Sequence, residues 1–326
     1  MKLNIYNSGE ATDTDKTTYP MTKGSKGEWS VTVPSVGGKY YTYTAAVEGG
    51  TYEVVDPYAR STGRNGKRGM ILDLDSTDPE GWNDASAHKI PSFASTAEAM
   101  TKSVIYEAQL RDLTIHESSR VSEANRGKFL GLTEKGTGDN MTPLDYLKDL
   151  GVTAVHFQPL YDFGSVDETF NVATYNKAGE YNWGYDPVNY NVPDGSYSSN
   201  PADGAARVRE MKEMIMALHN AGIQVVMDVV YNHVQSMNDS NFNKLMPGYY
   251  FRSDNTGKYF NGSGCGNETA SERAMFRRFM IDSVKYWQEE YKIDGFRFDL
   301  MGLHDIETMN ALYDELVKTN PDVMIY

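Results

Sequence analysis

Residues 294–299, with the sequence DGFRFD, place an arginine two positions before an aspartate. Side chains alternate along a strand, so Arg297 and Asp299 should share one face while Phe296 and Phe298 share the other. A nearby cation favours the ionised form of a carboxylic acid, and an ionised, positioned carboxylate can act as the nucleophile of a retaining glycosidase. The same spacing also fits a buried structural salt bridge, so spacing alone leaves both interpretations open.

A second candidate segment is residues 228–233, with the sequence DVVYNH. Asp228 ends an apolar run, and Asn232 and His233 follow in a predicted loop. A neutral imidazole both donates and accepts hydrogen bonds, which suits a ligand rich in hydroxyl groups. The alternatives are a helix or turn cap for Asp228 and a hydrogen-bonded core position for His233. We interpret the other histidines as structural: His88, His116, His156, His219 and His304.

Several common kinds of site have no counterpart in the sequence. There is no Cys/His cluster with metal-binding spacing, no phosphate-cradling glycine loop and no G-x-S-x-G nucleophile elbow. Cys265 is the only cysteine, so an intrachain disulfide is excluded. We therefore predict no metal ligands and no cofactor, and the sequence gives no indication for or against calcium.

The elements that would position these residues alternate between strand and helix. Compact apolar runs predict strands at 104–109, 152–159, 223–230, 293–300 and 323–326. Helical spacing and capping signals predict helices at 142–150, 205–221, 271–291 and 306–318. This alternation predicts an α/β fold, with about five strands of an incomplete (β/α)8 TIM barrel over residues 104–326. Barrel active sites lie at the carboxyl ends of the strands, where both candidate segments fall.

The first part of the chain has a different pattern of apolar and polar residues. Residues 1–80 show short alternating runs separated by glycine-rich or polar turns, which predicts a small antiparallel β-sandwich domain. Residues 81–103 read as a polar connector, and residues 161–202 as a long loop of the kind that is usually functional. The strands expected in the β-domain are 3–6, 29–33, 40–47, 52–55 and 70–74.

Composition narrows the choice of partners. The formal net charge of −14 disfavours nucleic acid, whose phosphates would be repelled. Aromatic residues make up 12% of the chain, and their flat faces suit sugar rings, although most should be core residues. No apolar run has membrane-spanning length, and no signal peptide opens the sequence, so we expect no membrane partner and favour the cytoplasm.

Seven stretches resemble known families. Residues 228–233 (DVVYNH) and 295–301 (GFRFDLM) resemble the first and second conserved regions of glycoside hydrolase family 13, the α-amylase family. Residues 104–112 (VIYEAQLRD) resemble its opening barrel strand, and residues 181–187 (YNWGYDP) are similar to the motif that marks type I pullulanases within it. GEWSVTVP, GKYYTYT and VVDPYAR resemble part of a carbohydrate-binding module of family 48.

The resemblance implies roles for four residues around the bond to be cut. Asp299 would be the nucleophile, and Arg297 would orient it and keep it ionised. His233 would hydrogen-bond the sugar on the non-reducing side of that bond, and Tyr185 would stack on the same sugar. These roles follow from the family motifs and not from spacing.

Four further residues receive supporting roles from the same resemblance. Asp228 and Asn232 would brace the site, and Trp183 and Asp186 would shape a pocket that admits a branch point. The implied activity is retaining hydrolysis of α-1,6-glucosidic branch linkages in pullulan, amylopectin or limit dextrins. The alternatives are another α-amylase-family activity (isoamylase, branching or α-1,4 hydrolysis) and a non-catalytic α-glucan-binding protein.

Two features lead us to expect a fragment cut at both ends. The family's acid/base glutamate should follow the fifth strand, and the sequence ends within that predicted strand, at Tyr326. Glu307 and Glu315 fall in a helical pattern and are not credible substitutes. The β-domain also begins partway through its expected pattern. We therefore expect this chain to be inactive when expressed alone.

Overall fold

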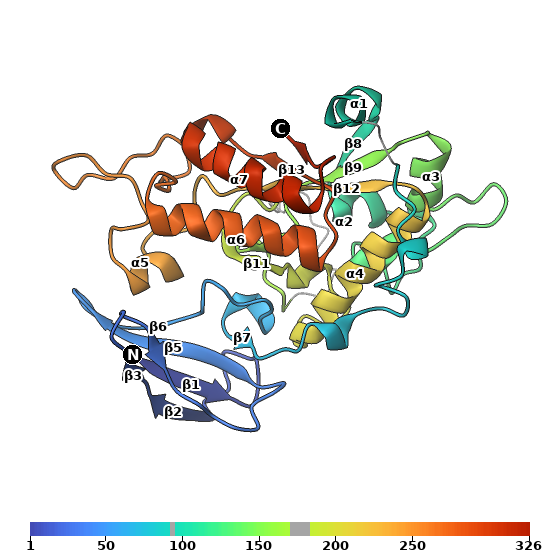
Figure 1. Cartoon of the computed structure of the whole chain (residues 1–326). Helices are drawn as coiled ribbons and strands as arrows, with labels where there is room; N and C mark the ends of the chain where they lie inside the picture. Colours follow the sequence, from blue (N-terminus) through green and yellow to red (C-terminus); the bar gives the residue numbers. More distant parts are fainter. Residues whose placement is uncertain (92–94, 170–182) are drawn as a thin grey trace.

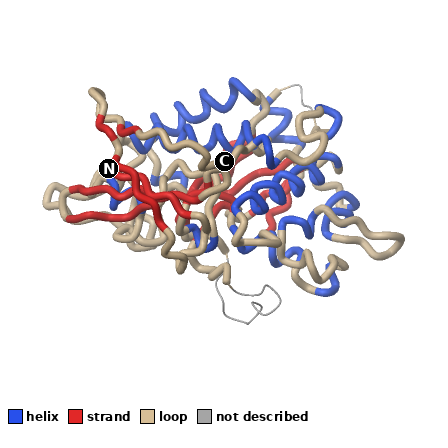
Figure 2. The backbone as a smooth tube through the Cα atoms, turned by 90° about the horizontal axis from the view of Figure 1, so that it is seen from below, coloured by secondary structure: helices blue, strands red, loops and turns tan. Residues whose placement is uncertain are grey.

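A computed structural model describes residues 1–91, 95–169 and 183–326, which form an antiparallel sheet and a larger α/β region (Figure 1). Figure 2 shows the N-terminal strands at one end of the molecule and most of the helices at the other. In the described part of the chain, no helix combines the length and the apolar character needed to cross a bilayer.

The α/β region is built on a five-stranded parallel sheet with the order β14-β13-β12-β9-β8. The strands are β8 (Ile105–Ala108), β9 (Ala154–Phe157), β12 (Gln224–Val229), β13 (Gly295–Phe298) and β14 (Met324–Ile325). All five predicted strands are present, each shorter than expected. A parallel sheet of this kind fits part of a (β/α) barrel, which confirms the predicted fold class.

Helices separate successive strands of the sheet. They are α3 (Pro143–Asp149), α4 (Gly204–Asn220), α6 (Ala274–Glu290) and α7 (Ile306–Thr319), which confirms the four predicted helices (Figure 1). Local sequence explains where they begin. Thr142 and Asp145 form a capping box at α3, with Pro143 in its first turn. Asp203 and Asp305 accept backbone N–H groups at the starts of α4 and α7.

The long loop predicted at residues 161–202 is in part a hairpin, which corrects that prediction. Strands β10 (Tyr161–Phe163) and β11 (Pro187–Pro193) pair antiparallel with an irregular register. Prolines at both ends of β11 and asparagines inside it concealed the strand pattern. Shorter helices that were also not predicted are α1 (Thr96–Lys102), α2 (Leu110–Thr114) and α5 (Asn241–Leu245).

Residues 1–70 contain an antiparallel sheet with the order β2-β1-β5-β6, and β7 pairs with β5. Its strands are β1 (Lys2–Tyr6), β2 (Lys16–Pro20), β5 (Tyr40–Val47), β6 (Gly50–Val54) and β7 (Gly69–Met70). A separate short pair joins β3 (Thr22–Lys23) and β4 (Trp29–Ser30). Strands β2 and β3 were not predicted, and the strands expected at 29–33 and 70–74 are much shorter.

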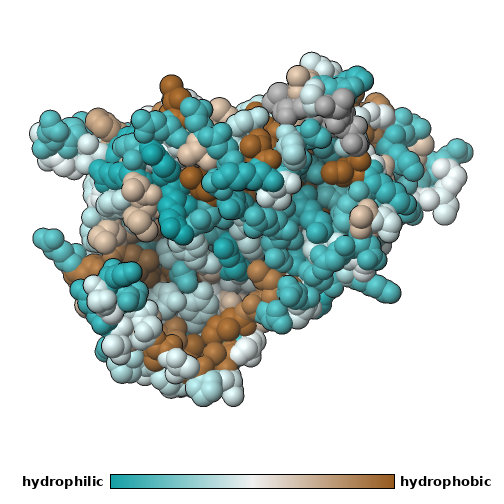
Figure 3. Space-filling model, viewed as in Figure 1, coloured by the Kyte–Doolittle hydropathy of each residue, from teal (hydrophilic) through white to brown (hydrophobic). Residues whose placement is uncertain are grey.

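This sheet packs against the α/β region through specific hydrogen bonds. Tyr40 Oη donates to the carbonyl of Ala202 at 3.1 Å, and Ser61 Oγ donates to the carbonyl of Gly204 at 2.7 Å. Figure 3 shows apolar side chains gathered on the surface of the N-terminal region, in the lower part of the view. A hollow of about 350 Å³ there is lined by Leu3, Tyr41, Tyr43, Tyr58, Arg60, Met70, Ile71 and Leu72. The division into domains near residues 80 and 103 stays a prediction.

Candidate active site

Strands β12 and β13 bring the two candidate segments together. They pair in parallel, with Asp228 directly opposite Arg297. Phe296 and Phe298 are buried in the main hydrophobic core, whereas Arg297 and Asp299 are partly exposed on the other face. The alternation expected from the sequence is therefore present, and both polar segments lie at the carboxyl ends of their strands.

Arg297 joins two carboxylates. Its Nη1 donates to Asp228 Oδ1 at 3.1 Å, to Asp228 Oδ2 at 3.0 Å and to Asp299 Oδ1 at 2.9 Å. Partial burial opposes the guanidinium charge, but Asp228 above all raises the pKa of Arg297. The Asp299 side chain is 16% exposed and that of Asp228 is fully buried, so Asp299 is the carboxylate that a substrate can reach.

Asn232 and His233 contact the same cluster from the loop that follows β12. Asn232 Nδ2 donates to the backbone carbonyl of Asp299 at 2.8 Å and to its Oδ2 at 3.0 Å. His233 places Nδ1 2.6 Å from Asn232 Oδ1 and Nε2 2.8 Å from the carbonyl of Tyr185. Burial lowers the pKa of His233, and the Tyr185 carbonyl and the charge of Asp299 oppose that shift.

Tyr185 reaches the cluster from the segment before β11. Its hydroxyl donates to Asp228 Oδ2 at 2.7 Å, and burial together with the charge of Asp228 raises the pKa of the phenol. The structure thus brings together six of the eight predicted site residues: Tyr185, Asp228, Asn232, His233, Arg297 and Asp299. Their roles in catalysis stay predictions.

The remaining two predicted residues have other surroundings. The indole of Trp183 is 57% exposed. Asp186 Oδ1 accepts from Ser165 Oγ at 3.0 Å, and the Asp186 carbonyl accepts from Gly164 N at 3.1 Å, which ties this residue to the end of β10. Burial raises the pKa of Asp186 to about 6. Tyr181 and Asn182, which complete the YNWGYDP motif, lie outside the described residues.

One residue interpreted as structural lies against the site. His156 is buried in β9, and its Nε2 is 3.2 Å from Asp228 Oδ2. In the sequence, this position could have been noticed because a histidine interrupts the otherwise apolar run Ala-Val-His-Phe. Because that run is buried on both faces, the sequence did not show which way the imidazole points.

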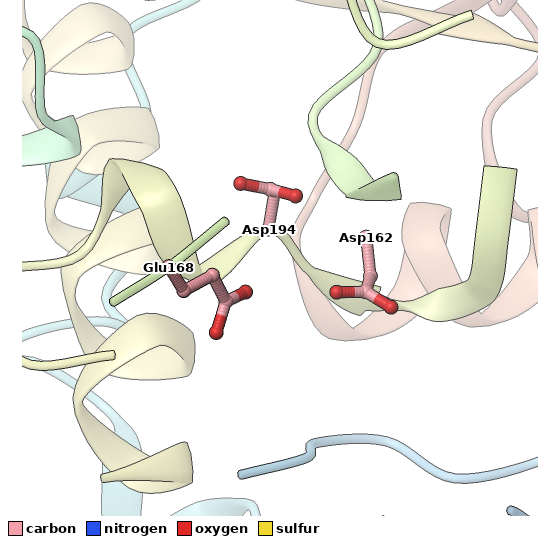
Figure 4. A group of neighbouring side chains, drawn as sticks. All are labelled: Asp162, Glu168 and Asp194. Atoms are coloured by element: carbon pink, nitrogen blue, oxygen red, sulfur yellow. The ribbon is translucent and has the colours of Figure 1, made fainter. Parts of the chain in front are cut away.

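A second group of acidic residues lies at the β10–β11 hairpin: Asp162 is in β10, Asp194 directly follows β11, and Glu168 converges with them (Figure 4). Each offers an oxygen within 4.8 Å of the others, a spacing that could hold a metal ion. Arg207 already supplies the countercharge, because its Nη2 is 3.0 Å from Glu168 Oε2 and its Nη1 is 4.0 Å from Asp162 Oδ1. These residues fit an internal ion cluster better than a metal site.

Parallel strands separated by helices, with an accessible carboxylate at the carboxyl ends of the strands, fit the class of α/β-barrel enzymes, whose active sites lie at those ends. Comparison with known families agrees with that class. Residues 92–260, more than half of the chain, match the family described as alpha amylase, catalytic domain. The chain belongs to this family.

Known pullulanases resemble nearly the whole chain. A pullulanase of Bacillus subtilis (strain 168) is 41% identical over 313 residues, which are 95% of this chain and 41% of that protein. The crystal structure of apo pullulanase from Paenibacillus barengoltzii superposes with a TM-score of 0.89 at 46% identity, covering 98% of this chain and 48% of that one. A pullulanase from Bacillus acidopullulyticus superposes with a TM-score of 0.88 at 44% identity, covering 100% of this chain and 38% of that one. The chain therefore spans less than half the length of these relatives.

Proposed function

We propose that the protein containing this chain is a retaining glycoside hydrolase that cleaves α-1,6-glucosidic branch linkages in pullulan, amylopectin or limit dextrins. The observation that carries the proposal is the carboxylate of Asp299. It stands partly exposed at the carboxyl end of β13 and is held by Arg297 and Asn232. The similarity to pullulanases supports the choice of linkage.

In this mechanism the carboxylate of Asp299 attacks the anomeric carbon and forms a glycosyl-enzyme, which water then hydrolyses. The two hydrogen bonds from Arg297 and Asn232 stabilise the ionised form that attack requires. Tyr185 and His233, which lie beside the cluster, would contact the sugar whose bond to the next residue is cut. The ring face of Tyr185 suits the C–H face of glucose. Both ring nitrogens of His233 contact protein oxygens, so a hydrogen bond from this imidazole to a sugar hydroxyl would replace its contact with the Tyr185 carbonyl.

Retaining hydrolysis also needs a second carboxyl group that protonates the leaving oxygen. Asp228 does not suit that role, because it is fully buried and accepts hydrogen bonds from Arg297 and Tyr185 on the same carboxylate. Asp228 is therefore not the acid. From the family motifs, we propose that residues 1–326 by themselves show no useful turnover. Tests of activity should use the longest natural protein that contains this sequence.

The proposal is tested by product analysis on pullulan. Cleavage of the α-1,6 bonds should release maltotriose, and the Asp299→Asn variant should release none. Glucose and maltose from linear α-1,4 glucans, without maltotriose from pullulan, would favour another α-amylase-family activity. Binding of α-glucan by a wild-type protein that cleaves neither substrate would identify a non-catalytic binding protein.

A further inference from the structure

His156 occupies a boundary inside the parallel sheet. Side chains of β9 alternate, so Ala154 and His156 lie on one face, and His156 is in register with Val226 of β12. Ala154, Val226 and Met324 form a small buried apolar cluster on this face. Two residues beyond Val226 along β12 comes Asp228, so the imidazole lies between an apolar layer and the charged strand ends.

The contacts of the ring give it a defined orientation. His156 Nε2 is 3.2 Å from Asp228 Oδ2, and the ring meets that of Tyr326 edge-on, with centroids 5.9 Å apart and an interplanar angle of 87°. A carboxylate oxygen accepts hydrogen bonds, so the tautomer that carries hydrogen on Nε2 donates a hydrogen bond to Asp228 Oδ2. A buried imidazole without such a partner would be costly, and this contact satisfies it.

Asp228 receives donors from three separate elements. They are His156 from β9, Tyr185 from the segment before β11 and Arg297 from β13. Two of these donors also face the substrate or its attacking group: Tyr185 stands beside the sugar position, and Arg297 holds Asp299. His156 is the donor that approaches from the interior, so it can fix the carboxylate without touching the ligand.

We propose that His156 is a positioning residue that holds the Asp228 carboxylate in place and, through it, orients Tyr185 and Arg297 for the glycosidase reaction. This inference rests on the proposed function. The alternative is that His156 only fills space in the core. The two roles differ in what a replacement must supply: an N–H donor at that place, or a volume of apolar atoms.

Two replacements separate the roles. His156→Gln retains an N–H donor at the end of a side chain of similar reach, and His156→Leu fills the space without a donor. Positioning predicts that Leu lowers kcat by about 10- to 100-fold, the range expected for losing a hydrogen bond to a charged group, while KM changes little. Gln should restore most of the loss. If Leu is as active as Gln or more active, at equal folded fractions by circular dichroism, the proposal is overturned.

His219 provides a matched control at the amino ends of the strands. His219 is also buried and places its Nε2 2.9 Å from Asp294 Oδ2, directly before β13 begins. His219→Leu and His219→Gln should lower the thermal midpoint yet leave kcat per folded molecule within about twofold. A fall in kcat as large as that of the His156 variants would show a general effect of losing a buried His–Asp pair and would overturn the positioning role.

Coupling to Asp228 completes the test. In an Asp228→Asn background the additional effect of His156→Leu should shrink to less than about threefold, because the two residues act on one group. If the effects of the two substitutions on kcat are fully additive, the proposal is overturned.

Wild-type protein is assayed first on pullulan and then on amylose, and the variants are compared on whichever substrate is cleaved. Cleavage of amylose alone refutes the linkage proposed above but leaves the His156 comparison valid, and cleavage of neither refutes both.

Discussion

Among the clusters of the described residues in which an arginine pairs with carboxylates, those of Arg297 and Arg207 differ sharply in exposure. At the strand ends, Arg297 joins Asp228 and Asp299, and the guanidinium is 32% exposed. Beside the β10–β11 hairpin, Arg207 is fully buried near Asp162, Glu168 and Asp194. Figure 4 draws these three carboxylates. The first cluster leaves one carboxylate open to a ligand, whereas the second encloses all of its charges.

The enclosed cluster joins distant parts of the chain. Arg207 donates to Thr62 Oγ1 and to the carbonyl of Gly63, both at 3.3–3.4 Å, and the N–H of Asn65 donates to Glu168 Oε2 at 2.6 Å. It therefore holds the N-terminal region against the start of α4. An arginine among carboxylates can thus belong to a reactive group, where one carboxylate oxygen stays accessible, or to a structural cluster, where all of the oxygens are enclosed.

The largest effect is expected from Asp299→Asn. Replacement of the nucleophile should lower kcat on pullulan by at least about 10⁴-fold, as for other essential catalytic groups. The free energy of unfolding should change by less than about 1 kcal/mol, because asparagine is nearly the same size and Arg297 keeps its pairing with Asp228. Rate measurements and urea denaturation of the same preparations check both parts. Robust turnover by this variant would place the nucleophile elsewhere.

Arg207→Met should affect stability instead of chemistry. Removing the cation leaves three buried carboxylates without it, and breaking a buried ion pair costs about 3–5 kcal/mol of unfolding free energy. Arg277→Met is the control, since this partly exposed arginine pairs with Asp305 and Glu307 near the surface and should cost under about 1 kcal/mol. Equal losses in chemical denaturation would contradict the distinction between the clusters.

Arg297→Lys should lower kcat by about 100-fold with little change in stability. Both carboxylates accept from Nη1 of Arg297, which the planar guanidinium holds in one place, and the flexible side chain of lysine would not hold its ammonium there in the same way. Steady-state kinetics together with thermal melting measures the effect. A variant within threefold of wild type would show that this bridge is dispensable for catalysis.

The smallest effect concerns pH. Burial, and next the charge of Glu168, raises the pKa of Asp162 to about 7, above its usual value of 3.8. The folded state then binds this proton more tightly than the unfolded state, so its contribution to stability is full below about pH 4 and is lost as the pH rises through 7. Relative to Asp162→Asn, wild-type protein should therefore lose at least about 1 kcal/mol between pH 4 and pH 8. If the difference in unfolding free energy between wild type and Asp162→Asn is the same at pH 4 and at pH 8, the raised pKa of Asp162 is refuted.

Much of the fold was readable from local patterns. Apolar runs and capping signals predicted the five parallel strands and the four main helices, because each depends on residues close together in the sequence. The hairpin containing β11 was missed, because two prolines and two asparagines in a seven-residue strand resemble a loop. Its pairing with β10 depends on tertiary contacts across more than twenty residues.

By itself, the sequence determined which residues share a face at the strand ends. The alternation in residues 294–299 places Arg297 with Asp299, and this follows from strand geometry alone. Only the tertiary structure decided what lies around them. The contact of His156 with Asp228 and the convergence on Arg207 depend on the register and packing of segments far apart in the chain, which no local pattern encodes.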